Sequence, residues 1–131
     1  MKPKTSLIIF TIAVILFSLA ACAGASTGDA GKVAEAFWQA LVDKNDATLS
    51  SLSCVAYEQE ALTTLESFRA VEVRLEVVTC SATPIDDATA SVACQGKVVA
   101  SYGAEDLEID LSRRTYRAVK EGGDWRMCGE E

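Results

Sequence analysis

Cysteines are the residues of this chain whose type and spacing define the clearest chemistry. The 131 residues contain five cysteines and no histidine. Four of the five, Cys54, Cys80, Cys94 and Cys128, form no close C-x-x-C pair, which disfavours a zinc site built from closely spaced thiolates or mixed Cys/His ligands. An even number of such cysteines is the pattern of disulfide bonds, which persist in oxidising compartments outside the cytoplasm.

The amino terminus independently indicates export. Met1, Lys2 and Lys4 form a short positive region, and the apolar run LIIFTIAVILF follows at residues 7–17. This order is typical of a secretory signal. The run is shorter than the roughly 20 apolar residues that a membrane-spanning helix needs. The sequence therefore predicts a cleaved signal peptide over residues 1–21.

Cys22 stands where the signal ends, and the tetrapeptide LAAC at residues 19–22 resembles the lipobox of bacterial lipoproteins. The resemblance implies transfer of diacylglycerol to the Cys22 thiol, cleavage just before Cys22 and, usually, acylation of the new α-amino group. One acyl chain holds a protein only weakly, whereas several make a lasting anchor. We therefore expect a palmitate-labelled protein at the extracytoplasmic face of a bacterial cell membrane, with residues 22–29 as a lipidated tether.

Charge limits the partners that this chain can bind. With 12 basic and 19 acidic residues its net charge is −7, and it becomes more negative when Lys2 and Lys4 leave with the signal. An acidic surface disfavours nucleic acid and electrostatic adsorption to anionic lipid. The basic residues near the end of the chain form one local cluster: Arg113, Arg114, Arg117 and Lys120. We interpret this cluster as a solvated strand face paired with acidic neighbours, the alternative being a docking site for an acidic partner.

Residues suited to catalysis are few. Histidine is absent, and the sequence contains no Gly-rich phosphate loop, no G-x-S-x-G motif and no cluster of metal ligands. Tyr57 and Tyr116 could donate hydrogen bonds into a cavity, but most Asp and Glu residues fall on expected wet faces or in turns. We therefore expect no catalytic residue, no metal and no cofactor.

Aromatic side chains are the other candidates for function. Five of them could line a pocket for an apolar ligand or a partner segment: Trp38, Tyr57, Phe68, Tyr116 and Trp125. The alternative is that these aromatics simply fill the core, which is the commoner role of such residues.

Helices come first among the elements that must position these residues. Residues 30–44 carry apolar side chains at helical spacing, and Asp29 is placed to cap the start. A short second helix, capped by Asp46 or Thr48, is expected to follow. A third helix is expected over residues 55–68, with its apolar stripe facing the core.

After residue 70 the apolar period changes from helical to two. Residues 71–77, 88–94 and 107–111 alternate apolar and polar side chains, and a final hairpin turns at the segment EGGD. This pattern predicts four antiparallel strands in a meander. A change of phase at residues 113–114 would turn Tyr116 inward beside the last strand.

Three pairings of the four domain cysteines are possible. We predict Cys80 with Cys94, across the first hairpin, and Cys54 with Cys128, because the end of the last strand can reach the helical layer. If the odd-numbered residues of 71–77 face inward, the even-numbered Cys80 would face outward, whereas Cys94 lies on the apolar, inward face of its own strand. Directly opposed residues share a face, so the Cys80–Cys94 pairing requires a bulge around Val77 that changes the phase of the first strand.

The order of elements and the terminal segment RAVKEGGDWRMCG, residues 117–129, resemble the cone-shaped, cystatin-like fold of nuclear transport factor 2 and the SnoaL-like cyclases. In that family a Gly-Gly-x-Trp element forms the last hairpin, and its tryptophan closes the core beneath the first helix; Gly122, Gly123 and Trp125 match it. The resemblance implies an α+β domain over residues 30–131, in which amphipathic helices pack on a curved four-stranded antiparallel meander. Function stays open, because this fold hosts enzymes, binders and assembly modules.

Together these patterns predict a lipid-anchored extracytoplasmic domain with a non-catalytic ligand-binding, partner-binding or assembly role. Its partners would be the membrane, through the lipid on Cys22, and an apolar ligand or a protein, but not nucleic acid. The alternative is an isomerase-like or dehydratase-like enzyme that uses the cone cavity. An open cone with converging polar groups would favour the enzyme, whereas a filled cone would favour interaction at the surface.

Overall fold

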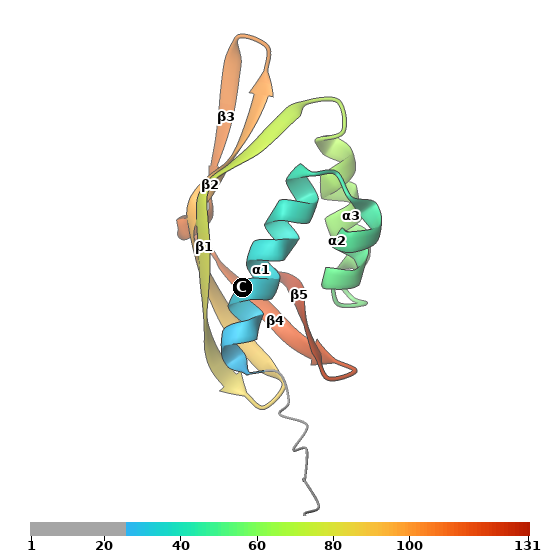
Figure 1. Cartoon of the computed structure of the whole chain (residues 1–131), viewed down its shortest axis with the longest axis vertical. Coiled ribbons are helices and arrows are strands. Elements are labelled where there is room, and N and C mark those ends of the chain that lie inside the picture. The colour runs from blue at the N-terminus through green and yellow to red at the C-terminus, as the bar shows by residue number, and fades with distance from the viewer. Residues whose placement is uncertain (1–25) are drawn as a thin grey trace, which may run out of the picture.

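The computed structural model describes residues 26–131. The predicted signal peptide, Cys22 and residues 23–25 of the predicted tether lie outside the described residues. Within the described residues, three helices precede a curled antiparallel sheet of five strands (Figure 1). Within residues 26–131 no helix has the length and apolar character needed to cross a membrane.

The first helix, α1 (Thr27–Val42), begins earlier than the sequence predicted. Ser26 is its N-cap, and the Ser26 backbone N–H donates to the Asp29 carboxylate at 2.9 Å. An acidic side chain in the first turn also interacts favourably with the helix dipole. Residues 27–29, assigned to the tether from their composition, therefore form the first turn of the helix.

The next two helices are α2 (Asp46–Leu52) and α3 (Glu58–Ser67). Asn45, and neither Asp46 nor Thr48, caps α2, because its side-chain oxygen accepts the Thr48 backbone N–H at 3.0 Å. Helix α3 starts three residues later than predicted. The reason is that the Cys54 backbone N–H donates to the Met127 carbonyl at 2.7 Å, which ties this segment to the sheet.

Five strands form the sheet: β1 (Glu72–Asp86), β2 (Thr89–Tyr102), β3 (Glu105–Asp110), β4 (Thr115–Glu121) and β5 (Asp124–Glu130). One edge of β2 pairs with β1. The other edge pairs with β4 through residues 89–93 and with β3 through residues 97–102. The predicted four-stranded meander is therefore wrong in strand number and order, because β2 is long enough for two successive strands to share one edge.

The predicted bulge lies in β1. The register against β2 shifts between Glu76 and Thr79, and Cys80 lies directly opposite Cys94. Val77 adopts a positive φ of 47° within the bulge. Val77 was expected to face inward, but its side chain is 88% exposed, because the extra residue turns it out and Val78 packs against the core instead.

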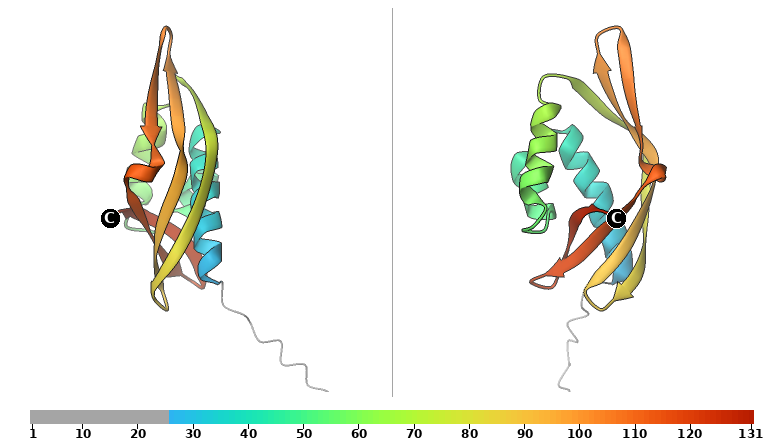
Figure 2. Two further views of the ribbon diagram at one scale, coloured as in Figure 1. Left: turned by 90° about the vertical axis from the view of Figure 1, so that its left-hand side faces the viewer. Right: turned by 180° about the vertical axis from the view of Figure 1, so that it is seen from behind.

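Strand β3 corrects another prediction. Leu107 and Ile109 were expected on a buried face, yet they are 50% and 37% exposed. The β2–β3 hairpin extends beyond the helices, so nothing in the described part of the chain covers these side chains fully (Figure 2). The predicted change of phase is present as the short 3-10 turn η1 (Leu111–Arg113), after which Tyr116 is buried.

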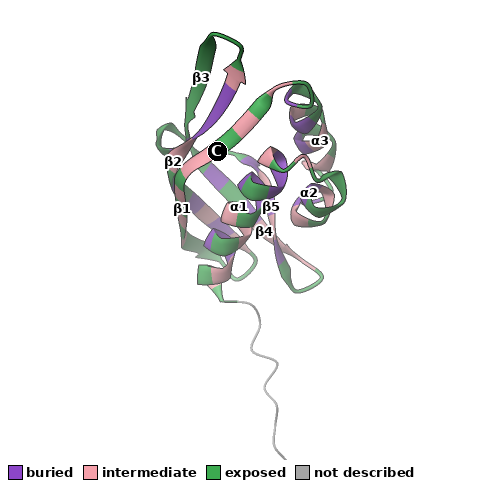
Figure 3. Cartoon of the chain, turned by 45° about the horizontal axis from the view of Figure 1, so that its top comes forward, coloured by how far each residue is buried: buried purple, intermediate pink, exposed green. Residues whose placement is uncertain are grey.

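Helix α1 lies across the concave face of the sheet (Figure 1). Figure 3 colours residues by burial, and the buried residues of α1 belong to the same core cluster as those of the strands. Gly31 permits close contact with β1, since a Cβ there would lie 2.7 Å from the Cys80 carbonyl oxygen. The carboxylate of Glu35 accepts the Cys80 backbone N–H at 2.8 Å. These contacts hold α1 against the middle of β1 and leave space between α1, α3 and the open end of the sheet.

Candidate functional site

A cavity of about 320 Å³ opens between α1, α3 and the sheet. This volume is at the small end of the range of about 300–1,000 Å³ that is typical of ligand sites. The aromatic residues of its walls are Phe37, Trp38, Tyr57, Phe68 and Tyr116. All but Phe37 belong to the set that the sequence singled out. The structure therefore brings together four of the five predicted lining residues.

Trp125, the fifth, lies elsewhere. Its indole N–H donates to the Ser26 carbonyl oxygen at 2.9 Å, next to the first turn of α1. Lys120 Nζ lies 5.0 Å from the centroid of the Trp125 ring. The β4–β5 turn carries Trp125 to one end of the sheet, whereas the cavity opens near Tyr116 and Glu130 at the other end of the same hairpin. Trp125 therefore closes the core beneath α1, as the resemblance implied; it does not line this cavity but borders a separate pocket with Val33 and Leu52.

The rings of the cavity wall support one another. Trp38 meets Phe37 edge to face, with ring centroids 5.4 Å apart, and meets Tyr116 in the same way at 5.3 Å. Phe37 also stacks on Tyr57, with centroids 6.0 Å apart. Such arrangements suit the charge distribution of aromatic rings. The cavity wall is thus formed before any ligand binds.

Two hydroxyl groups give the cavity polar character. Burial, together with repulsion from Glu60 and Glu130, raises the pKa of Tyr57 to about 12. Burial is also the main cause that raises the pKa of Tyr116 to about 12, and Glu130 contributes to that shift. Both phenols therefore stay protonated near neutral pH and can donate a hydrogen bond to a ligand.

Charged side chains surround the mouth of the cavity: Glu60, Asp110, Arg114 and Glu130. Arg114 forms an ion pair with Glu130, and Arg113 lies 4.0 Å from Asp110, which leaves the Glu60 carboxylate as the uncompensated charge at the mouth. Hydrogen bonds from the side chain and backbone of Ser112 lower the pKa of Asp110. The mouth is therefore net negative and disfavours an anionic ligand.

The interpretation of the basic cluster is confirmed in part: the three arginines have acidic neighbours, but Arg113 and Arg114 precede strand β4 and Lys120 contacts the Trp125 ring instead. The Arg113 side chain lies 4.0 Å from Asp110, and that of Arg117 lies 3.4 Å from Glu131. These groups are largely exposed, and exposed pairs contribute little to stability.

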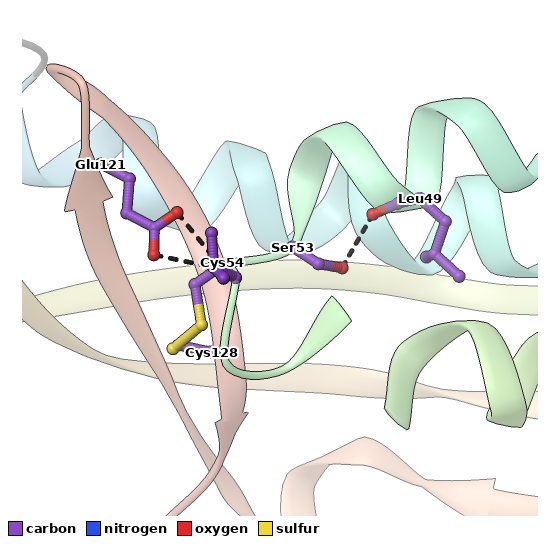
Figure 4. Close-up of a disulfide and its surroundings, with 6 residues drawn as sticks. Leu49, Ser53, Cys54, Glu121 and Cys128 are labelled. Carbon is purple, nitrogen blue, oxygen red and sulfur yellow. Dashed lines mark hydrogen bonds between the residues drawn. A yellow bond between two sulfur atoms is a disulfide. The ribbon is translucent and has the colours of Figure 1, made fainter. Parts of the chain in front are cut away.

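The cysteines pair as Cys54 with Cys128 and Cys80 with Cys94, which is the connectivity that the sequence predicted. The Cα atoms are 5.2 Å apart in the first pair and 4.1 Å apart in the second. In the close-up of the first disulfide, the Ser53 hydroxyl beside it donates to the Leu49 carbonyl oxygen at 2.8 Å (Figure 4).

The Cys54–Cys128 disulfide also holds part of the cavity. It joins the segment just before Tyr57 to the segment just before Glu130, and both of these residues line the cavity. Gly129 contacts the Tyr57 ring, since a Cβ on this glycine would lie 3.5 Å from Cδ2. The disulfide therefore fixes the distance between α3 and β5 at one wall.

Sequence reasoning missed some of the cavity residues. Phe37 lies on the same apolar stripe as Trp38, so the choice of Trp38 as a lining residue could have led to Phe37 as well. Glu60, Arg114 and Glu130 carry no such signal, because only the tertiary structure places the start of α3 and the segments around β4 and β5 at the same mouth.

The fold is that of known cone-shaped proteins. The chain is similar to the structures of a proposed dehydratase of the NTF2-like family from Streptomyces avermitilis (16% identity, 74% of this chain and 86% of the other, TM-score 0.51) and a proposed ketosteroid isomerase from Shewanella frigidimarina (16%, 75% and 89%, 0.52). It is also similar to that of a proposed scytalone dehydratase from Novosphingobium aromaticivorans (15%, 73% and 74%, 0.51).

These similarities define the class of fold: three helices on a curled antiparallel sheet, the NTF2-like α+β cone. At such identities they show the fold alone. No protein-family model matches the chain, and no curated protein sequence matches it significantly.

Proposed function

We propose that this chain is a lipid-anchored, extracytoplasmic binding domain whose cavity takes a small apolar ligand. The observation that carries this proposal is the cavity of about 320 Å³ with five aromatic side chains in its walls. Apolar walls with a few polar groups are typical of small-molecule sites. The edge-to-face contacts among the rings support a preformed site, which lowers the entropic cost of binding.

The anchoring part of the proposal rests on the sequence. LAAC follows a charged region and a short apolar run, as in bacterial lipoproteins. The two disulfides are consistent with an oxidising compartment. A domain attached only through the modified amino terminus would leave the mouth of the cavity free to meet its ligand.

Replacing Cys22→Ser is expected to abolish metabolic labelling of the protein with palmitate and to block processing at this site, because the thiol is the group that accepts the lipid. Labelled cells and an electrophoretic mobility assay measure both effects. A Ser26→Ala variant, altered outside the lipobox, should keep the label. Palmitate retained by the Cys22→Ser variant would contradict the anchor.

A Thr64→Phe substitution tests the binding site. Thr64 lies on α3 and lines the cavity, so a phenyl ring there should occupy the space of the ligand. The affinity for indane, a neutral apolar probe, is expected to fall by about ten-fold or more, which corresponds to about 1.4 kcal/mol. Calorimetric titration of the mature protein in lipid nanodiscs, corrected with empty nanodiscs, measures this affinity.

The matched control is Thr63→Phe, because Thr63 is exposed on the same helix and does not line the cavity. This variant should bind indane within about two-fold of the parent, well below a tenfold change. If indane does not bind the parent at all, or if both variants bind it equally well, the proposed cavity function is wrong.

An isomerase-like or dehydratase-like enzyme is the second candidate. The names of the similar structures favour it weakly, and the cone is open, with two tyrosine hydroxyls at its wall. Proton-transfer catalysis also needs a base within reach of the substrate. Tyr57 and Tyr116, with pKa values of about 12, can donate but cannot accept a proton near neutral pH. Asp110 lies at the mouth with a lowered pKa, which makes it a weak base. Glu60 also lines the cavity and is a candidate base, so the enzyme remains the alternative, and we favour binding because the aromatic walls support it directly.

A further inference from the structure

The outer edge of β3 differs from the other two edges of the sheet. At the edge of β1, α1 lies alongside, and the Glu35 carboxylate accepts the Cys80 backbone N–H. At the edge of β5, the Cys54 backbone N–H donates to the Met127 carbonyl oxygen at 2.7 Å. Strand β3 pairs only with β2 among the described residues, and its hairpin extends beyond the helices (Figures 1 and 2). Alternate N–H and C=O groups of β3 are therefore free to pair with another strand.

The β2–β3 hairpin has an apolar face beside this edge. Ile109 lines the cavity, and Leu107, two positions earlier in the strand, lies on the same face. Their partners on β2, Val98 and Ala100, are buried, whereas Leu107 and Ile109 are 50% and 37% exposed. A strand added at the edge of β3 would cover part of this apolar surface.

Negative charge surrounds the same edge. Strand β3 has the sequence EDLEID, with four carboxylates and no cation. The nearby cations lie close to these carboxylates and to one on β1: Arg74 to Glu76 and Asp106, Lys97 to Glu76 and Glu108, and Arg113 to Asp110. Four carboxylates thus share three cations, and Glu105 forms no ion pair with another described residue. Exposed pairs of this kind are weak, so the cations of a partner can compete for the carboxylates.

A second copy of the chain is a poor match for this edge. In any register that keeps Leu107 and Ile109 of both copies on one face, the even-numbered residues of the two strands oppose each other. Asp106, Glu108 and Asp110 of one copy would then face the same carboxylates of the other. Like charges directly opposite each other destabilise a sheet, so a basic partner fits better.

We propose that the outer edge of β3 is a docking site for an extended segment of another protein, in which apolar and basic residues alternate. The segment adds one strand to the sheet, and its backbone pairs with β3. Its apolar side chains cover Leu107 and Ile109, and its basic side chains meet the carboxylates on the opposite face. This surface is separate from the proposed ligand cavity and adds a protein partner to it.

The peptide KVKIKVK is the probe for this surface, and KKVIVKK, with the same composition but no alternation, is its control. The mature protein is labelled with ¹⁵N in nanodiscs of zwitterionic lipid, to which basic peptides adsorb weakly. KVKIKVK should bind about ten-fold more tightly than KKVIVKK in a calorimetric titration. It should also slow the hydrogen exchange of alternate backbone amides in residues 105–110, because those N–H groups gain acceptors.

A Glu108→Lys substitution should weaken the binding of KVKIKVK about ten-fold. Asp87→Lys is the matched control, since Asp87 is exposed in the turn at the opposite end of β2 and the net charge changes equally. This variant should bind the peptide within about two-fold of the parent. If the two substitutions weaken binding equally, the peptide responds only to the net charge of the protein, and the docking site is wrong.

The parent protein alone can also refute the proposal. Failure of KVKIKVK to bind, equal binding of the two peptides, or unchanged exchange of the β3 amides would each overturn it. Slower exchange of these amides at rising protein concentration, without peptide, would assign the edge to a second copy and overturn it as well. These measurements do not involve indane, so they leave the cavity function to its own test. If Glu108→Lys does not fold, the measurements on the parent decide the question.

Discussion

Replacing both Cys54 and Cys128 with alanine is expected to lower the free energy of unfolding by about 4 kcal/mol. The two cysteines are separated by 74 positions in the sequence, and in the chain-entropy model a disulfide stabilises more as the loop that it closes becomes longer. Cys54 is also completely buried. Because a domain of this size is stable by only about 5–15 kcal/mol, the loss should be visible in urea unfolding at constant pH.

The matched control is the double replacement of Cys80 and Cys94. This disulfide spans only 14 positions, and its removal should cost about 3 kcal/mol in the same model. The variant lacking Cys54 and Cys128 should also bind indane more weakly, since that disulfide holds Tyr57 and Glu130 at the cavity. A larger loss of stability from removing the short loop, or free thiols in the parent protein, would contradict this account.

A Gly96→Ala substitution is expected to destabilise the domain by about 2–5 kcal/mol. Gly96 has a φ of +93°, which L-residues adopt at a cost of about 1–2 kcal/mol. A Cβ there would lie 2.5 Å from the Glu76 carbonyl oxygen and would also meet the Val77 carbonyl. Forcing the backbone of the bulge to move adds about 1–3 kcal/mol. Thermal and urea unfolding measure the change.

Gly103→Ala is the control for this effect. Gly103 also has a positive φ, +76°, but no heavy atom lies within 4 Å of a Cβ built on it. This variant should show the backbone cost alone, about 1–2 kcal/mol. If Gly96→Ala proves no more destabilising than Gly103→Ala, the close approach of Gly96 to the bulge is wrong.

Much of the fold was predictable because it depends on local patterns. Helical spacing indicated the three helices, although their ends shifted where capping or tertiary contacts intervened, as at Asn45 and Cys54. The conflict of phase between Val77 and Cys94 predicted a bulge, and the bulge is present. Periodicity could not show that Leu107 and Ile109 remain partly exposed, because burial depends on whether another element covers the strand.

The candidate site was predictable in part. Aromatic residues on apolar stripes indicated most of the wall. The same reasoning grouped Trp125 with them, although it lies at the other end of the β4–β5 hairpin, because a stripe does not tell one end of a sheet from the other. The mouth was not predictable, since Glu60 on α3 and Glu130 on β5 reach the same cavity only through the tertiary fold.

By itself the sequence determined the class of fold and the pairing of the cysteines, and it indicated a signal peptide with a lipid-modified Cys22. These features depend on the order of motifs, on the spacing of apolar residues, and on whether a residue occupies an odd or an even position of its strand. Only the tertiary structure decided that the cone is open and that, within residues 26–131, the Trp38 N–H has no partner while the Trp125 N–H has one. The physical reason is that a donor's partner is set by which distant segments pack beside it, and residue type alone does not specify that packing.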